Sequence, residues 1–326
     1  MSARTRDAVF GAGALERLAR VARFEPGLLV EDFAAPGARE ALAAAEVLLT
    51  GWGCPPLDEA ALDRMPRLRL VAHAAGTVKQ HVTDAVWRRG VLVSTAAAAN
   101  ALPVAEYTVA AVLLSNKRVL DTASAFRRAR GDIGAFEALA GAGNYRRTVG
   151  VVGASRVGRR VLELLRPYDL RLLVHDPYLG PAAAAGLGAE WAGLDHLCRT
   201  CDVVSIHAPE LPATRHLFDA ARLALLRDGA TLVNTARGSL VDTAALTAEL
   251  VAGRLHAVLD VTDPEPLPAD SPLWDLPNVL LTPHVAGSLG TELTRLADTA
   301  TGEIERWARG LPLAHPVRAE DLDRSA

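Results

Sequence analysis

Six short apolar runs in the second half of the chain constrain the fold more than any other feature. Each is rich in valine, leucine or isoleucine, and stretches with helical character separate them. Continuous apolar runs of this length are typical of strands buried on both faces of a parallel sheet. The pattern therefore predicts a parallel α/β sheet covered by helices. The runs are TVGVVG (148–153), LRLLVHD (170–176), CDVVSIHAP (201–209), ATLVNTA (230–236), HAVLDV (256–261) and VLLTPH (279–284).

A less regular series of the same kind precedes these runs. Two alanine-rich stretches, AREALAAA (38–45) and LDEAALDRM (57–65), predict helices. Strands are predicted at GLLV (27–30), EVLLTG (46–51), RLVAHAA (69–75) and VLVST (91–95). The chain therefore contains two α/β series, each with its own sheet.

Between the two series, residues 100–120 predict a long helix. It should begin after Pro103 and be buried, because it is apolar nearly all round. Residues 121–147 are more polar and indicate an irregular segment. From Thr291 an amphipathic helix follows the last strand, and we expect it to pack on the first domain. The expected domains are residues 1–99, completed by 290–326, and residues 100–289.

Composition excludes several classes of protein. The formal net charge is −3 and no basic run stands out, which disfavours nucleic acid and anionic membranes as partners. No apolar run approaches the ~18 residues that a membrane-spanning helix needs. The N-terminus lacks the apolar core of a signal peptide, so a soluble cytoplasmic protein is expected. Cys198 and Cys201 form a C-x-x-C pair without a second pair for zinc, so we expect packing cysteines and no metal site.

The first run of the second series ends in a glycine-rich turn. Gly153, Ser155 and Gly158 follow G-x-G-x-x-G, with serine in the second glycine place. Such a turn presents backbone N–H groups at a helix N-terminus to a pyrophosphate. Asp176 stands 18 residues after Gly158, at the end of the next strand. A carboxylate there accepts bonds from the adenine ribose and repels a 2′-phosphate, which favours NAD over NADP.

Three further strands of this series end in polar residues. Arg237 directly follows ATLVNTA, and His284 is the last residue of VLLTPH. Asp260 lies near the end of HAVLDV, and Glu265 follows that run. Each alone has an ordinary explanation, since the chain has nine histidines, Arg237 could be a surface arginine and DPEPLP could be a rigid loop. Ligands of such sheets bind at the carboxyl ends of the strands. The sequence therefore places a cation, a carboxylate and an imidazole on one rim of one sheet.

These residues resemble the D-isomer-specific 2-hydroxyacid dehydrogenase family. The likeness covers most of the chain and is strongest from Asn100 to Gly287. Its signatures are GVVGASRVG (150–158), HAPELPATRHLF (207–218) and the run LVNTARGSLVDTAAL…LDVTDPEPLP…LTPHVAG. The resemblance implies a Rossmann NAD-binding domain, residues 100–289, inserted into a discontinuous flavodoxin-like substrate-binding domain. It also implies NAD as the cofactor and a homodimer formed through the inserted domain.

The resemblance also implies the catalytic roles. Arg237 would hold the substrate's carboxylate and carbonyl oxygen, which a planar guanidinium can bind together. His284 would give a proton to the carbonyl oxygen as hydride reaches the carbon. Glu265 would pair with His284 and stabilise its imidazolium form. The implied reaction interconverts a 2-keto acid and a D-2-hydroxy acid. Formate dehydrogenase is disfavoured, because its members pair this histidine with glutamine.

The cofactor site follows from the same signatures. Asp260 resembles the family's contact to the nicotinamide carboxamide. The N–H groups of Arg156 and Val157 would meet the pyrophosphate. The complete expected set is Gly153, Ser155, Arg156, Val157, Gly158, Asp176, His207, Ala208, Pro209, Thr214, Thr235, Ala236, Asp260, Ala286 and Gly287.

The substrate side departs more from the family. Val78 stands where a Gly-x-Gly turn would have its second glycine. Lys79 could serve an anionic substrate or simply be solvated. Apart from Arg237, the expected substrate contacts are Trp52, Ala75, Gly76 and Thr77.

The identity of the substrate is open. A 3-phosphoglycerate dehydrogenase remains an option, although the chain ends without room for the regulatory domain that many of those carry. The alternative class is a dinucleotide-sensing, corepressor-like binding protein, which shares the fold and even the three catalytic residues. No basic patch or interaction tail in the sequence favours it.

Overall fold

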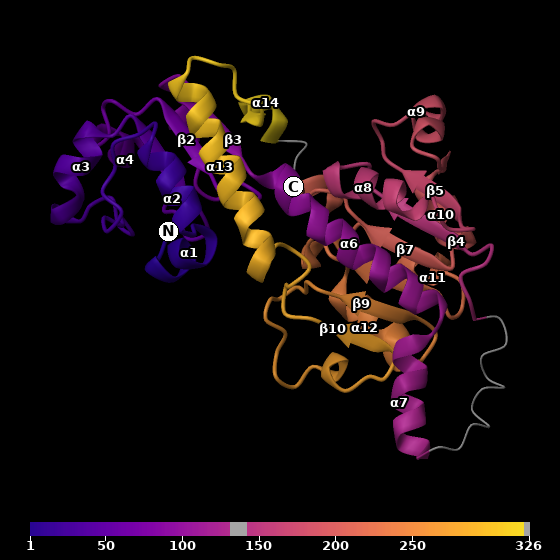
Figure 1. The fold of residues 1–326 in the computed structure, drawn as a ribbon. Helices are drawn as coiled ribbons and strands as arrows, with labels where there is room; N and C mark the ends of the chain where they lie inside the picture. Colours follow the sequence, from indigo (N-terminus) through magenta and orange to yellow (C-terminus); the bar gives the residue numbers. More distant parts are fainter. Residues whose placement is uncertain (131–141, 323–326) are drawn as a thin grey trace. The chain divides into compact units, whose positions relative to one another are not determined.

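The computed structural model describes residues 1–130 and 142–322, and the chain divides into two compact units. Unit 1 comprises Met1–Ala101 and Ser288–Ser325, and unit 2 comprises Leu102–Gly287. The helix α6 (Ala97–Asn116) begins in unit 1 and continues into unit 2 (Figure 1). The sequence analysis placed the two domain boundaries at 99/100 and 289/290, within two residues of the boundaries in the structure. The assignment of unit 1 to substrate binding stays a prediction.

Unit 1 contains a four-stranded sheet in the order β1-β2-β3-β11. The first three strands are parallel, and β11 pairs antiparallel with β3. The strands are β1 Val47–Thr50, β2 Leu70–His73, β3 Leu92–Thr95 and β11 Pro316–Val317. The helices are α1 Ala3–Val9, α2 Ala12–Ala19, α3 Arg39–Ala44, α4 Glu59–Asp63, α5 Asp84–Arg88, α13 Leu293–Ala308 and α14 Ala319–Leu322. As expected, α13 packs in this unit, with Leu296 and Ala300 buried beside Val9.

Unit 2 contains a seven-stranded parallel sheet in the order β10-β9-β8-β7-β4-β5-β6. The strands are β4 Thr148–Val152, β5 Arg171–His175, β6 Glu190–Trp191, β7 Val203–Ile206, β8 Thr231–Asn234, β9 His256–Leu259 and β10 Val279–Leu281. The helices are α7 Val119–Ala129, α8 Arg156–Leu165, α9 Pro181–Gly186, α10 Leu194–Thr200, α11 Ala220–Leu225 and α12 Thr243–Val251. Single 3₁₀ turns lie in unit 1 at Pro36–Ala38 and Gly290–Glu292. In unit 2 they lie at Pro212–Thr214, Gly238–Leu240 and Pro272–Trp274.

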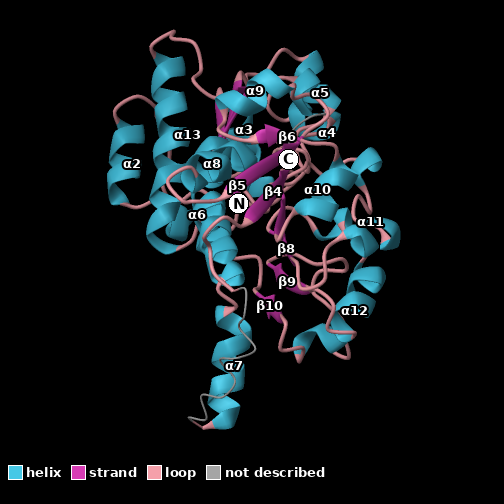
Figure 2. Cartoon of the chain, turned by 90° about the vertical axis from the view of Figure 1, so that its right-hand side faces the viewer, coloured by secondary structure: helices cyan, strands magenta, loops and turns pink. Residues whose placement is uncertain are grey.

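Helices cover both faces of the unit 2 sheet, so its strands are buried on both sides. Figure 2 shows α10, α11 and α12 on one face and α6 and α8 on the other. Alternate residues of β8 point to opposite cores, because Leu232 packs in one cluster and Val233 in the other. This confirms the interpretation of the apolar runs as doubly covered strands. The strand order reverses between β4 and β7, and such a point is where doubly wound sheets bind their ligands.

Cys198 and Cys201 are the packing cysteines that the sequence predicted. Both are fully buried, and both thiols are free. Burial raises the pKa of Cys198 to about 11. Neither thiol is therefore suited to nucleophilic chemistry.

Three predictions about secondary structure were wrong. Residues 27–30 form no strand, because Pro26 and Gly27 lie in a turn closed by the bond from Leu28 N to Glu25 O (3.0 Å). Part of the segment expected to be irregular is the helix α7, which precedes the glycine-containing stretch. Residues 131–141 of that segment lie outside the described residues. The sequence also missed β6 and β11, which have only two residues each.

The third wrong prediction concerns α6. It begins at Ala97, not after Pro103, because the alanine-rich turn before the proline has high helix propensity. The helix is not buried all round, since Glu106 and Leu114 are exposed. By length and composition alone α6 could cross a membrane, but a helix packed in a protein core passes the same test. Here its residues Ala105 and Val112 pack against the sheet of unit 2.

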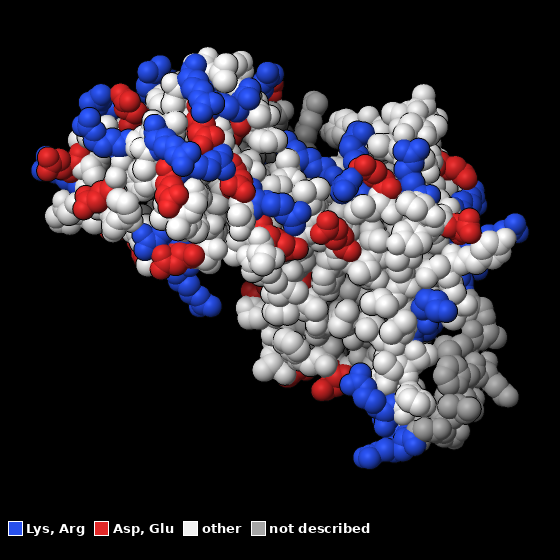
Figure 3. All heavy atoms as spheres, in the orientation of Figure 1, with Lys and Arg blue, Asp and Glu red and all other residues white. Residues whose placement is uncertain are grey.

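Charged side chains of both signs are interspersed on the face drawn in Figure 3. Within unit 1, Arg17 forms ion pairs with Asp298 (2.8 Å) and Glu305 (3.0 Å). The pair with Asp298 is exposed, and exposed ion pairs contribute little to stability.

Candidate active site

The glycine-rich turn joins β4 to α8, beside the point where the strand order reverses. Gly153 has φ +98°, and a Cβ there would lie 2.6 Å from the backbone nitrogen of Ala208. A Cβ on Gly158 would lie 2.0 Å from the carbonyl oxygen of Gly153. Both contacts are with backbone atoms, which cannot rotate away. The two glycines are therefore required by the close approach of strand, helix and neighbouring loop.

Ser155 occupies the second glycine place without strain. Its backbone is extended (φ −66°, ψ 179°), and its hydroxyl caps α8 by accepting from Gly158 N (3.3 Å). Serine is among the preferred residues at such a cap. The turn thus keeps the form that presents helix N-terminal amides to a phosphate. Arg156 and Val157 open the helix at this point.

Asp176 lies against the same turn. One carboxylate oxygen accepts from Ala154 N (2.7 Å) and the other from Tyr178 N (2.8 Å). Each oxygen can accept a further bond, because a carboxylate has about four acceptor sites. The side chain therefore carries its charge to the end of β5 beside the turn, as dinucleotide recognition requires.

The loop after β7 forms the next side of the turn. His207 and Ala208 are buried, and Thr214 folds the loop by donating to Pro209 O (2.7 Å) and accepting from Leu211 N (2.9 Å). Burial lowers the pKa of His207 to about 3. Its ring is thus neutral and contacts Ser205 Oγ (2.9 Å). The His207 side chain packs in the core, and its backbone lies against Gly153 of the glycine-rich turn.

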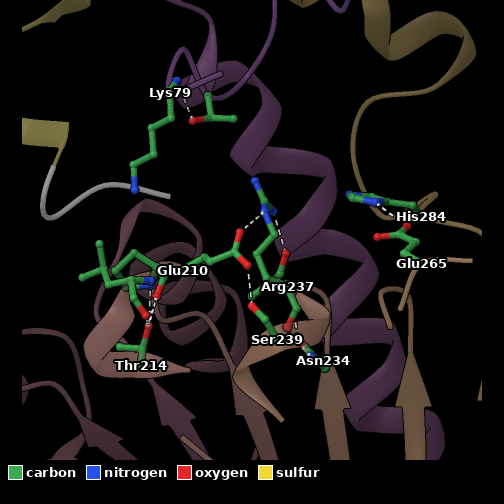
Figure 4. A network of polar contacts seen from close by, with 12 residues as sticks. Lys79, Glu210, Thr214, Asn234, Arg237, Ser239, Glu265 and His284 are labelled. Atoms are coloured by element: carbon green, nitrogen blue, oxygen red, sulfur yellow. Dashed lines mark hydrogen bonds and ion pairs between the residues drawn. The ribbon is translucent and has the colours of Figure 1, made fainter. Parts of the chain in front are cut away.

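The loop after β8 carries Arg237. The side chain of Asn234 folds this loop, donating to Arg237 O (2.8 Å) and accepting from Ala236 N (3.0 Å). Thr235 is tied to Thr108 of α6 by their hydroxyls (3.1 Å). Figure 4 shows the guanidinium turned towards Glu210, whose carboxylate is 4.0 Å from Arg237 Nε. Glu210 also accepts a bond from the hydroxyl of Ser239.

The imidazole of His284 contacts the carboxylate of Glu265. His284 Nδ1 lies 2.9 Å from Glu265 Oε1, and both side chains are about half exposed, at 50% and 44% (Figure 4). An ionised carboxylate only accepts, so Nδ1 carries a proton and Nε2 is left to exchange one. The pair can therefore act as an acid–base unit that is open to a reactant.

Asp260 directly follows β9 and makes several hydrogen bonds to the loop after β10. It is only 1% exposed, and its carboxylate accepts from the hydroxyl of Thr282 and the backbone N–H groups of Val285 and Ala286. These bonds hold the loop that carries His284. A contact between Asp260 and the nicotinamide stays a prediction.

The predicted substrate contacts of unit 1 lie on two neighbouring loops. Trp52 follows β1 and is 45% exposed. Ala75, Gly76 and Thr77 follow β2, which pairs with β1 in parallel. Thr77 Oγ1 accepts from the backbone nitrogen of Lys79 (3.3 Å). Both loops thus leave the same edge of the unit 1 sheet.

In unit 2 the structure gathers the predicted catalytic residues at one edge. Arg237, Glu265 and His284 follow β8, β9 and β10, which are adjacent parallel strands. The sequence missed the residues that hold their loops. Asn234 had a local signal, since it directly precedes the Thr-Ala-Arg segment. The missed residues are Tyr107, Glu210, Asn234, Ser239 and Thr282.

Within residues 1–130 and 142–322, no group of three or more His, Cys, Asp or Glu side chains is placed to hold a metal ion. Unit 2 combines a doubly wound sheet and a glycine-rich turn with an acidic residue at the next strand end and a His–Glu pair. Together these features define a class of protein. It is the class of dinucleotide-binding α/β proteins equipped for proton transfer.

Comparison with known proteins narrows this class to a family. Residues 109–286 match the model of the D-isomer specific 2-hydroxyacid dehydrogenase, NAD binding domain. The chain belongs to this family, and its unit 2 is an NAD-binding Rossmann domain.

Named relatives agree with this assignment. The chain is 36% identical over 253 residues to a D-3-phosphoglycerate dehydrogenase of Mycobacterium bovis, covering 77% of this chain and 47% of that protein. It is 33% identical to a glyoxylate reductase of Aeropyrum pernix, covering 84% and 82%. A solved structure from Thermus thermophilus superimposes with a TM-score of 0.77 at 32% identity, covering 94% and 97%. The chain spans about half the length of the phosphoglycerate dehydrogenases that it matches.

Proposed function

We propose that the protein interconverts a 2-keto acid and a D-2-hydroxy acid, with NAD as the redox partner. The observation that carries this proposal is the His284–Glu265 pair at 2.9 Å, on the strand edge that also bears Arg237. Family membership and the relatives named for such reactions support it.

NAD fits the residues around the glycine-rich turn. The two glycines permit backbone contact where a Cβ would clash, and Ser155 keeps the helix capped. The charge of Asp176 at the end of β5 supports the choice of NAD over NADP. When bound, the reduced cofactor supplies a hydride.

The residues of the chain supply the rest of the reaction. In the reduction direction Arg237 binds the carboxylate and the carbonyl oxygen of the keto acid through its planar fork. His284 donates the proton on Nε2 to the carbonyl oxygen as the carbon gains hydride. Glu265 accepts from Nδ1 and stabilises the imidazolium before the transfer. In the oxidation direction neutral His284 takes the hydroxyl proton back.

The Glu210 carboxylate gives Arg237 a defined orientation before substrate arrives. At 4.0 Å it is a weak ion pair, and its side chain is 56% exposed. A substrate carboxylate that binds the guanidinium bidentately is a stronger partner. We therefore expect the substrate to displace this contact.

We further propose that two copies associate through unit 2. Four large apolar side chains on α6, on α7 and near β4 support this, because they are exposed in a single chain. They are Leu114 (42%), Val119 (37%), Phe126 (49%) and Tyr145 (69%). Light scattering should give twice the chain mass, and Phe126→Asp should halve it. We also keep the cytoplasmic location that the sequence suggested.

The proposed reaction is tested by NADH oxidation with a panel of 2-keto acids, including glyoxylate, pyruvate, hydroxypyruvate and its 3-phosphate. At least one should turn over to the D-2-hydroxy acid, and His284→Ala should abolish turnover while leaving NADH binding intact. NADH binding without turnover of any panel member would favour the dinucleotide-sensing alternative.

A further inference from the structure

The loop that carries His284 is built around Asp260. The backbone N–H groups of Val285 and Ala286 donate to its two carboxylate oxygens, each at 2.8 Å. The backbone N–H of His284 donates to the carbonyl oxygen of Asp260 at 3.0 Å. Two successive amides thus bind the Asp260 carboxylate, and a third binds the carbonyl oxygen of the same residue.

His284 itself has an unfavourable backbone conformation. Its φ is +55°, in the left-handed region that favours glycine. A residue with a side chain keeps such a conformation only where surrounding contacts impose it. The bonds to Asp260 are among the contacts that hold the backbone of His284 in this conformation.

A hydroxyl pair supports Asp260 from the side of α6. Thr282 Oγ1 lies 2.6 Å from Asp260 Oδ1 and 2.8 Å from the phenol oxygen of Tyr107. An ionised carboxylate only accepts, so Thr282 gives its single proton to Asp260 and accepts from Tyr107. Burial, together with the charge of Asp260, raises the pKa of Tyr107, which keeps the phenol protonated and able to donate.

We propose that Tyr107 and Thr282 are positioning residues for His284, acting through Asp260. The chain of bonds runs from Tyr107 to Thr282 and then to Asp260. Asp260 in turn accepts from the backbone amides of His284, Val285 and Ala286. Tyr107 belongs to α6 and is 175 residues from Thr282 in the sequence, so the pair ties the His284 loop to a long helix. The catalytic consequence rests on the proposed function, whereas the structural consequence does not.

The structural consequence is tested by hydrogen exchange at single amides in the full chain. Thr282→Val removes the hydroxyl at nearly constant size, and the Val285 and Ala286 amides should exchange roughly tenfold faster or more, as expected for a lost bond to a charged group. Tyr107→Phe should accelerate the same amides by about 2- to 12-fold, the range of a neutral bond. Thr282→Ser should restore the wild-type rates.

A matched control removes a hydroxyl elsewhere in unit 2. Thr247 donates to Thr243 O within α12 (2.7 Å), and Thr247→Val should leave the exchange of Val285 and Ala286 unchanged. Exchange within twofold of wild type in both Thr282→Val and Tyr107→Phe would overturn the proposal, whether or not the protein turns over a keto acid.

The kinetic arm measures keto-acid reduction in the same variants. Thr282→Val should lower kcat by about 10- to 100-fold, as expected for a misplaced catalytic group, with an unchanged KM for NADH. The solvent isotope effect on kcat should rise, because proton donation becomes slower. The double variant should be no slower than Thr282→Val alone, since both changes break one chain of bonds. Additive losses or an unmoved isotope effect would refute the positioning role, whereas an inactive wild type with altered exchange would refute only the proposed function.

Discussion

Replacing Gly238 by alanine should separate the loop that carries Arg237 from the loop that leads to Glu265. A Cβ on Gly238 would lie 2.0 Å from both the carbonyl carbon and the carbonyl oxygen of Thr262, and 2.5 Å from the nitrogen of Asp263. These are backbone atoms, so no rotamer change relieves the overlap. The separation must grow from 2.0 Å to about 3.4 Å, where ordinary contact begins, a displacement of about 1.4 Å.

A displacement of this size is large for a reacting group. A misplacement of about 1 Å can cost on the order of 100-fold in rate, so Gly238→Ala should lower kcat/KM for the keto acid by roughly 100-fold or more. Overpacking typically costs about 1–3 kcal/mol in stability, which leaves most domains folded. NADH binding should persist, because Gly153 and Gly158 of the cofactor turn are unchanged.

The assay compares kcat/KM, NADH affinity and the urea midpoint of wild type, Gly238→Ala and the control Gly186→Ala. Gly186 ends α9, has nothing within 4 Å of its added Cβ and should tolerate alanine without loss of activity. Wild-type kcat/KM in Gly238→Ala would refute the reasoning, because the two loops would then not depend on this contact.

Other predictions follow from single residues. Arg237→Lys keeps the charge but loses the planar fork, so kcat/KM should fall on the order of 100-fold with unchanged NADH affinity, and a rate within twofold of wild type would show that Arg237 is not the substrate anchor. Asp176→Asn keeps an acceptor for Ala154 N but removes the charge, so fluorescence titration should find a narrower preference for NADH over NADPH. Burial lowers the pKa of His73 from 6.5 to about 3, so below pH 6.5 the unfolded chain binds a proton that the folded chain does not. Stability should fall on acidification, by about 2 kcal/mol at pH 5 for this one group, and urea unfolding of His73→Gln should show a smaller loss.

The fold of unit 2 could be predicted because its signals are local. A strand buried on both faces needs a continuous apolar run, as in Leu172, Leu173 and Val174 of β5, and a tight turn next to another backbone needs a glycine, as at Gly153. Unit 1 was harder. Its last strand, Pro316–Val317, has two residues and exists through its pairing with β3. A pairing partner more than 200 residues away leaves no pattern in the strand itself.

The same distinction holds for the candidate site. Arg237 and His284 could be proposed from the sequence because reacting groups in such sheets are expected at strand ends and are of particular types. The residues that hold them could not. Tyr107 bonds to Thr282 across 175 residues, and Thr108 bonds to Thr235 across 127. Each has an ordinary place in its helix or just after its strand, and only the fold brings the partners together.

His284 and Glu265 should act as one acid–base unit, and the most direct test is kcat/KM for keto-acid reduction in wild type, Glu265→Gln, His284→Ala and the double variant. Glutamine keeps a hydrogen-bond acceptor but removes the charge that faces Nδ1 of His284, so reduction should fall in Glu265→Gln. The same change in the His284→Ala background should have little further effect, because its partner is already absent. An equal loss in both backgrounds would contradict the coupling of His284 to Glu265.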